Sequence, residues 1–267
     1  MKNLFLRELK RNFKSFTIWL IILVIVNGFM FVAFESVAET ATNTEAMLSQ
    51  YPEAFIKAMS LDKFDMTNIL HYYASRSYIL FMLFGSIYSV MLSSCILSKE
   101  ESDRSIEFLL SKPITRNEIV SAKLLCVFIY VFGFNLLFSI FNFGFMQFFK
   151  INNFDIKEFI LISLGGFLIH MIFASIGYLL SVFITKIKSI ISVTFGIIFI
   201  TYFFSILASV EEKMSFLKYL SPFSYYGAED LVINSNLDFI YLIVTLIIIV
   251  LSVGLTFLFY SRKDITA

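Results

Sequence analysis

Six long runs of apolar residues divide the chain, and polar segments of very different lengths separate them. Each run contains 19 to 26 residues and no Asp, Glu, Lys or Arg. A helix of roughly 20 apolar residues crosses the hydrocarbon core of a bilayer, whereas a β-barrel would show runs of about 10 residues with alternating polarity. The pattern predicts an all-α, polytopic membrane protein that forms one domain over residues 1–267. The six predicted transmembrane helices cover residues 16–34, 78–98, 124–149, 159–184, 189–210 and 239–260.

The distribution of Lys and Arg predicts how these helices are oriented. If the N-terminus is cytoplasmic, the inner segments hold 14 basic residues and the outer segments hold 7. An excess of Lys and Arg marks the cytoplasmic side of a membrane protein, so we expect both termini in the cytoplasm. Residues 35–77 and 211–238 are then the long outer loops. The inner segments are residues 1–15, 99–123, 185–188 and 261–267.

The N-terminal segment has the pattern of an amphipathic helix. Apolar residues recur on one helical face and basic residues on the other, which is typical of a helix that lies in the headgroup plane. We expect such an interfacial helix before the first span; the alternative is a solvated basic tail. The apolar face comprises Phe5, Leu6, Leu9, Phe13 and Phe16, and the basic face comprises Arg7, Lys10, Arg11 and Lys14.

Composition supports the bilayer assignment and excludes several classes of function. The chain is 58% hydrophobic and only 15% charged, with a mean hydropathy of +0.83, whereas soluble domains are about a quarter charged. With 21 basic and 20 acidic residues it has no excess charge for binding nucleic acid. Its two histidines and the lack of an H-E-x-x-H motif give no metal site of the zinc-protease kind.

The segment 99–123 differs from the rest of the chain. It contains five basic and five acidic residues around an apolar centre, Phe108 to Leu110. Pro113 disfavours a continuous helix, so we expect a helix, a turn and a second helix capped by Thr115 or Asn117. Apolar anchors surrounded by charges are typical of a docking surface for another protein. The alternative is a solvated connection, although ordinary connections are much shorter.

This segment resembles the cytoplasmic loop of the type-2 ATP-binding-cassette (ABC) exporter permeases. Its sequence is E-x-x-R-S-I-E-F-L-L-S-K-P-I-T-R-N-E-I-V-S-A-K, and Arg104 departs from the family pattern, which usually has glycine there. The N-terminal F-x-R-E-L-K-R segment, the YPEAFIKAMSLD segment and LKYLSPFSYY are also similar to this family. The loop positions that match the family are Glu101, Ser105, Glu107, Leu109, Leu110, Pro113, Thr115, Arg116 and Lys123.

The resemblance implies that residues 99–123 form a coupling helix that fits a groove on a separate ABC ATPase subunit. The chain lacks a G-x-x-x-x-G-K-[ST] motif, so it is not expected to be an enzyme or to hold a cofactor; ATP and magnesium would bind to the partner. The resemblance further implies an exporter in a prokaryotic plasma membrane, formed with a second copy or a related permease. The expected ATPase-docking residues are Glu101, Arg104, Glu107, Phe108, Leu109, Leu110, Pro113 and Arg116.

Polar residues inside the predicted spans are candidates for a second site. Asn135, Asn142 and His170 could line a translocation pathway or form hydrogen bonds between helices. Gly166 and Gly177 share a helical face with His170, which directs this side chain toward protein.

Amphiphilic cargo, such as a lipid, a peptide or a drug-like molecule, suits spans without charges. Three other functions stay open: a secondary transporter, a non-transporting membrane scaffold and an intramembrane protease. The carboxylate relay that many proton-coupled transporters need is absent from the spans. The EESDR sequence (Glu100–Arg104) departs from the Glu-Glu-x-x-x-Arg protease motif because its arginine comes one residue early.

Overall fold

The computed structural model describes residues 2–40, 52, 63–103, 113–184 and 186–263, and these residues form helices, turns and short connections. Two single-turn α-helices, two π-helical turns and one 3₁₀ helix accompany the longer helices. The elements are α1 (Lys2–Val32), α2 (Phe34–Thr40), α5 (Ile69–Tyr72), η2 (Tyr73–Ser77), α6 (Tyr78–Ser102), α8 (Arg116–Phe149), α9 (Ile156–Phe183), α10 (Ile187–Val210), η3 (Glu212–Leu220), α11 (Pro222–Tyr225), η4 (Glu229–Ile233) and α12 (Phe239–Arg262).

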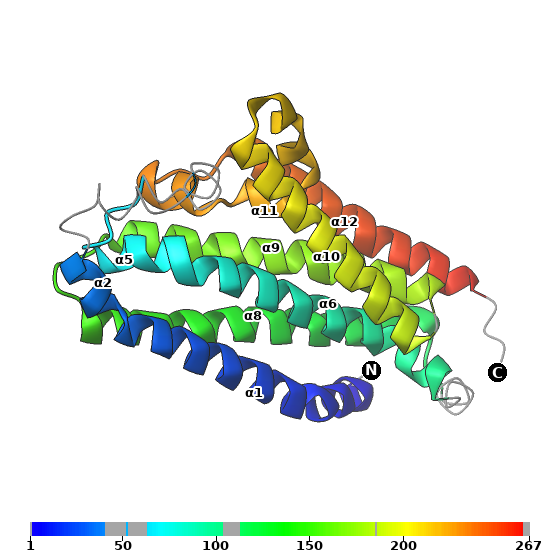
Figure 1. Ribbon diagram of the computed structural model, residues 1–267. Helices are drawn as coiled ribbons and strands as arrows, with labels where there is room; N and C mark the ends of the chain where they lie inside the picture. The colour runs from blue at the N-terminus through cyan, green and yellow to red at the C-terminus, as the bar shows by residue number, and fades with distance from the viewer. Residues whose placement is uncertain (1, 41–51, 53–62, 104–112, 185, 264–267) are drawn as a thin grey trace.

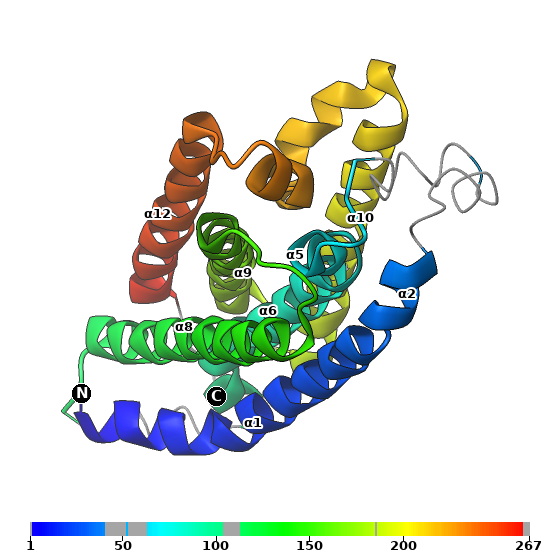
Figure 2. The same ribbon diagram turned by 90° about the vertical axis from the view of Figure 1, so that its left-hand side faces the viewer.

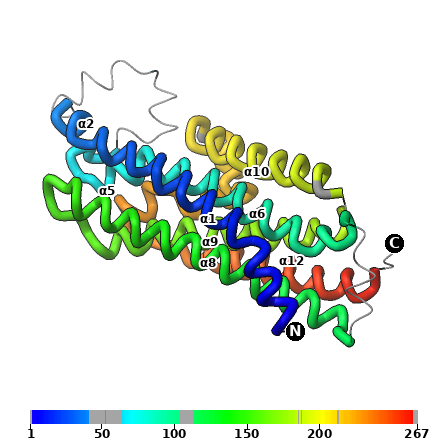
Figure 3. The backbone as a smooth tube through the Cα atoms, turned by 90° about the horizontal axis from the view of Figure 1, so that it is seen from below, coloured from blue at the N-terminus to red at the C-terminus, as the bar shows by residue number. Residues whose placement is uncertain are grey.

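Six helical segments of the described chain are long and apolar enough to cross a membrane, which confirms the predicted all-α, six-span fold. They correspond one to one with the predicted spans. The start of α1 and the end of α12 lie at the same end of the bundle, together with the end of α6 and the start of α8 (Figures 1 and 3). We call this the termini end and the opposite one the far end.

The helices α6 and α9 form the centre of the bundle. Viewed along the bundle, α9 is surrounded by α6, α8 and α12, while α1 packs outside α8 and α10 packs outside α6 (Figure 2). The close approach of α6 and α9 depends on small residues: a Cβ atom at Gly85 would overlap the His170 ring, and one at Gly166 would overlap Phe81. The predicted small-residue face of α9 therefore packs against α6.

Side-chain caps explain where several of the long helices begin. The Thr115 hydroxyl accepts a hydrogen bond from the Glu118 backbone N–H at 3.2 Å, and the Glu118 carboxylate accepts one from the Thr115 N–H at 2.9 Å. This reciprocal arrangement is a capping box, so Thr115, one of the two expected residues, caps α8. Asp155 and Asp238 cap α9 and α12 in the simpler way, by accepting from the backbone N–H two residues on.

The helix α1 is one continuous helix of 31 residues, about 46 Å long at a rise of ~1.5 Å per residue. No helix break separates the predicted interfacial segment from the first span. The burial pattern adds a feature that the sequence did not predict, because Glu8 is fully buried together with Leu4 and Phe16, while Phe13 is exposed. The N-terminal segment therefore packs against the bundle through a face that contains a carboxylate.

The far ends of α10 and α12 are connected by η3, α11 and η4 (Figure 1). Tyr226 anchors this connection, because its carbonyl accepts a hydrogen bond from the Tyr78 hydroxyl at 3.1 Å and its own hydroxyl lies 2.8 Å from Thr245 Oγ1. Burial raises the pKa of Tyr226, so the phenol stays protonated. The connection is thus held against α6 and α12.

Candidate functional site

The predicted docking segment 99–123 joins α6 to α8, and the structure describes both of its ends. Residues 99–102 end α6 and Asp103 caps it, whereas residues 113–115 precede α8 and residues 116–123 form its first turns. Pro113 is exposed just before the Thr115 cap. Five of the predicted docking residues lie outside the described residues: Arg104, Glu107, Phe108, Leu109 and Leu110.

The two other predicted docking residues, Glu101 and Arg116, both contact the end of α12. The Glu101 carboxylate accepts hydrogen bonds from Lys263 Nζ at 2.9 and 2.7 Å. Arg116 Nη1 donates to the backbone carbonyls of Tyr260, Ser261 and Lys263 at 3.4, 3.2 and 2.5 Å. The last carbonyls of a helix have no hydrogen-bond donor within the helix and carry partial negative charge. A guanidinium supplies both N–H donors and a positive charge. Residues near both ends of segment 99–123 thus contact the end of α12.

A cluster of charged residues lies beside this contact and joins three helices. Glu100 of α6 forms an ion pair with Lys123 of α8, and its other oxygen accepts from Arg7 at 3.2 Å and Arg11 at 3.1 Å of α1. Arg11 also pairs with Glu8 at 2.7 Å. We call these five residues the charge cluster. It ties α1 to both ends of the predicted docking segment.

The charge cluster is largely buried, so its charges need close partners. The side chains of Glu8, Glu100 and Lys123 are at most 4% exposed. Lys123 Nζ also donates to the Ile96 carbonyl, which satisfies a second of its three protons. Moving a charge out of water costs several kcal/mol, and only close opposite charges and hydrogen bonds offset this cost. The cluster is therefore stable as a set, and each member depends on the others.

The sequence did not predict the charge cluster. The basic residues of the N-terminal segment fit the basic face of an interfacial helix, and Lys123 stands out in the sequence only as a match to the family pattern. One signal was available: Glu8 follows Leu4 by four positions, so it lies on the same helical face as a buried apolar residue. The partner of Glu101, Lys263, is 162 positions away, and only the folded chain brings the two together.

The predicted polar residues inside the spans form two pairs between helices. His170 of α9 lies with Nδ1 2.9 Å from Asn135 Oδ1 of α8 and with Nε2 3.2 Å from the Phe81 carbonyl oxygen of α6. Asn142 of α8 accepts a hydrogen bond from the Asn27 amide of α1. All four side chains are buried. Asn135 and His170 thus come together, and Asn142 lies in a separate contact that holds α1 to α8.

These features define a class: an integral membrane protein of six spanning helices, in which the polar connection between α6 and α8 is fixed to two other helices, α1 and α12, at the termini end. Comparison with known families then identifies the family. The family model for ABC-2 family transporter proteins matches residues 2–265. The chain belongs to this family and is an ABC-2 type permease, which confirms the resemblance of the 99–123 segment. No individual curated protein matches the chain significantly.

Proposed function

We propose that this protein is the membrane-spanning subunit of an ABC exporter and that a separate ATPase subunit moves it by binding to residues 99–123. Family membership supports a permease role. The observation that carries the mechanism is that both ends of this segment are fixed to other helices. Glu101 and Arg116 hold α12, and Glu100, which is itself paired with Lys123, holds α1.

The mechanism follows from these contacts. When the ATPase subunit closes on ATP and magnesium, it displaces the docked segment with Phe108, Leu109 and Leu110 as its apolar anchors. Since the segment continues into α6 and α8, these helices tilt with it. The salt bridge of Glu101 and the hydrogen bonds of Arg116 carry the displacement to α12, and the charge cluster carries it to α1. Four of the six spanning helices then move together and open a path to the outside.

The rest of the transporter is inferred from the same features. The termini end faces the cytoplasm, as the excess of Lys and Arg predicts, and the family resemblance implies the plasma membrane of a prokaryotic cell. Few side chains of α10 and α12 are buried in the single chain, which supports assembly with a second copy or a related permease around a shared path. An apolar groove between α8 and α9, lined by Phe132, Leu136 and Phe167 among others, supports amphiphilic cargo.

Co-purification tests the docking role. The tagged chain is purified in mild detergent from its native cells, and chains with a phosphate-loop ATPase sequence are quantified by mass spectrometry. We expect such an ATPase with the wild type and a loss of about tenfold or more with Leu109→Arg or Leu110→Arg, because a buried charge replaces an apolar anchor.

The matched control is Leu220→Arg, which places the same charge on an exposed leucine of η3 at the far end. This variant should retain the ATPase at the wild-type level. If both loop variants retain the ATPase and insert into the membrane normally, the docking role is wrong.

A further inference from the structure

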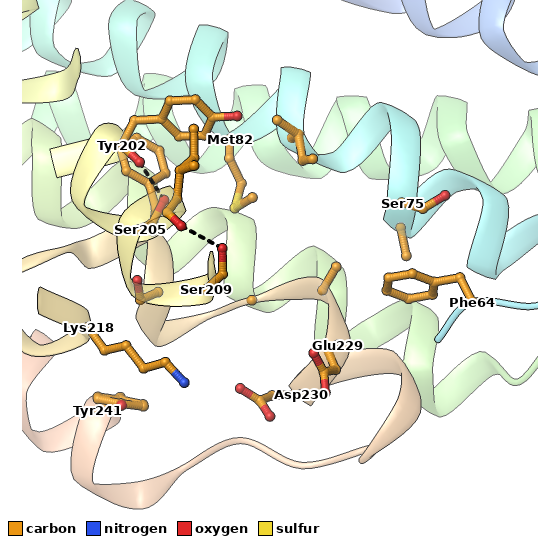
Figure 4. Close-up of a pocket in the computed structure, with 17 residues that line it drawn as sticks. Phe64, Ser75, Met82, Tyr202, Ser205, Ser209, Lys218, Glu229, Asp230 and Tyr241 are labelled. Carbon is orange, nitrogen blue, oxygen red and sulfur yellow. Dashed lines mark hydrogen bonds between the residues drawn. The ribbon is translucent and has the colours of Figure 1, made fainter. Parts of the chain in front are cut away.

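A pocket at the far end combines charged and apolar walls. It has a volume of about 220 Å³ and lies between α6, α10, η3, α11 and η4. Its inner part is lined by Ile79, Met82 and the rings of Tyr202 and Phe223, which meet edge to face with centroids 5.6 Å apart. Lys218, Glu229 and Asp230 line its opening (Figure 4).

The charges at the opening are of opposite sign and on different elements. Lys218 of η3 extends toward Asp230 of η4 in Figure 4, yet no ion pair joins these two described residues. Lys218 forms no hydrogen bond or ion pair with any other described side chain. Glu229, in contrast, is paired with Lys63 at 2.6 Å. Lys218 and Asp230 thus line the same pocket without forming an ion pair with each other.

Asp230 keeps acceptor capacity for a ligand. Its Oδ1 accepts from the Asn234 side chain at 2.9 Å, and its Oδ2 accepts from no described residue. The Ser205 hydroxyl of the opposite wall donates to the Tyr202 carbonyl at 2.7 Å, so toward the pocket it presents an oxygen that can only accept. Asp230 and Ser205 therefore offer acceptors that suit an N–H donor or an ammonium group.

The surroundings of Lys218 indicate that the ligand comes from the membrane. In the same 3₁₀ helix, Phe216 is 60% exposed, Tyr219 67% and Leu220 57%. Exposed aromatic residues beside a lysine are typical of the boundary between headgroups and acyl chains. The volume is below the roughly 300–1,000 Å³ of pockets for drug-sized ligands, so it suits a headgroup rather than a whole lipid.

We propose that this pocket binds the headgroup of a zwitterionic phospholipid. The phosphate lies beside Lys218, the ammonium group lies beside Asp230, and the apolar part of the lipid follows the wall formed by Met82 and Phe223. This proposal rests on the proposed function, in which the cargo is amphiphilic. It adds a site for lipid recognition at the outer end of the path.

Binding of short-chain lipids to the purified permease, without an ATPase, tests the proposal. Dihexanoyl phosphatidylcholine is titrated below its micelle concentration into protein in maltoside detergent, and heat or fluorescence reports binding. We expect Lys218→Ala and Asp230→Asn each to weaken binding about tenfold, since each removes one charge-assisted contact. Lys213→Ala and Glu211→Gln, on exposed residues outside the pocket, are the controls and should bind as the wild type does.

Two further probes distinguish the source and the charge of the ligand. Free phosphocholine should bind much more weakly, because it lacks the apolar part. Dihexanoyl phosphatidic acid should bind more weakly to the wild type and regain affinity in Asp230→Asn, because repulsion by the carboxylate is removed. Equal binding of phosphocholine and the lipid would overturn the assignment to lipid, and binding unaffected by both pocket variants would overturn the site. A failed co-purification would instead overturn the ATPase docking and leave this binding unchanged.

Discussion

At the scale of single residues, the most consequential side chain is Lys123. It is 1% exposed and lies between the Glu100 carboxylate and the Ile96 carbonyl. The identity of this residue matters because a long cation must reach from α8 to the end of α6 through a region closed to water. Removing one partner of a buried ion pair takes away part of the attraction that offsets the desolvation of the other charge. This destabilises the protein more than the loss of an exposed ion pair does.

We predict that Lys123→Met destabilises the protein by about 3–5 kcal/mol, because it removes the ammonium group that pairs with the buried Glu100 carboxylate. Thermal unfolding of the purified permease in detergent measures the effect. Lys10→Met, on the exposed face of α1, is the control and should melt with the wild type. Adding Glu100→Leu to Lys123→Met should recover part of the loss. Equal melting temperatures for the Lys123 and Lys10 variants would contradict the account of the cluster.

At the scale of helices, the apolar runs located the six spans but not the full length of the helices that contain them. Uninterrupted apolar runs mark the membrane-embedded part of a helix, so all six spans were found. The helices continue beyond these runs wherever the backbone meets no stop signal. Thus α8 begins at Arg116, directly after the Thr115 cap and eight positions before its apolar run, and α1 begins at Lys2. The capping residue and the amphipathic N-terminal pattern predict these two extensions. Hydropathy carries no information about such polar extensions.

The contact between α6 and α9 gives a prediction at this scale. Gly85→Ala places a methyl group against the buried His170 ring, which is held by Asn135 and the Phe81 carbonyl and has little room to move. Overpacking of this kind costs roughly 1–3 kcal/mol, so the apparent Tm in detergent should fall by several degrees. Gly196→Ala is the matched control: a Cβ there meets nothing within 4 Å, and alanine favours the helix. A Gly85 variant as stable as the Gly196 variant would show that the two helices are not closely packed there.

At the scale of the whole molecule, the contacts on which the proposed mechanism depends join residues that lie far apart in the sequence. The docking segment was recognisable from its charge density and its family pattern. Its contacts were not, because Arg7 and Arg11 lie about 90 positions from Glu100, and Arg116 lies 147 positions from the Lys263 carbonyl that it binds. Charge alone cannot select such distant partners. Folding brings them to the termini end, where one segment is joined to α1, α6, α8 and α12.

Photo-crosslinking from segment 99–123 tests directly whether this segment binds a separate ATPase subunit. A benzoylphenylalanine replaces Phe108 in the full-length protein in its native cells, and the same residue replaces Phe216, an exposed phenylalanine at the far end, as the control. Mass spectrometry then identifies the crosslinked chains. We expect a covalent adduct between position 108 and an ATPase subunit with a phosphate loop, and no such adduct from position 216. An ATPase adduct from position 216, or none from position 108 in a protein that is inserted and stable, would contradict this expectation.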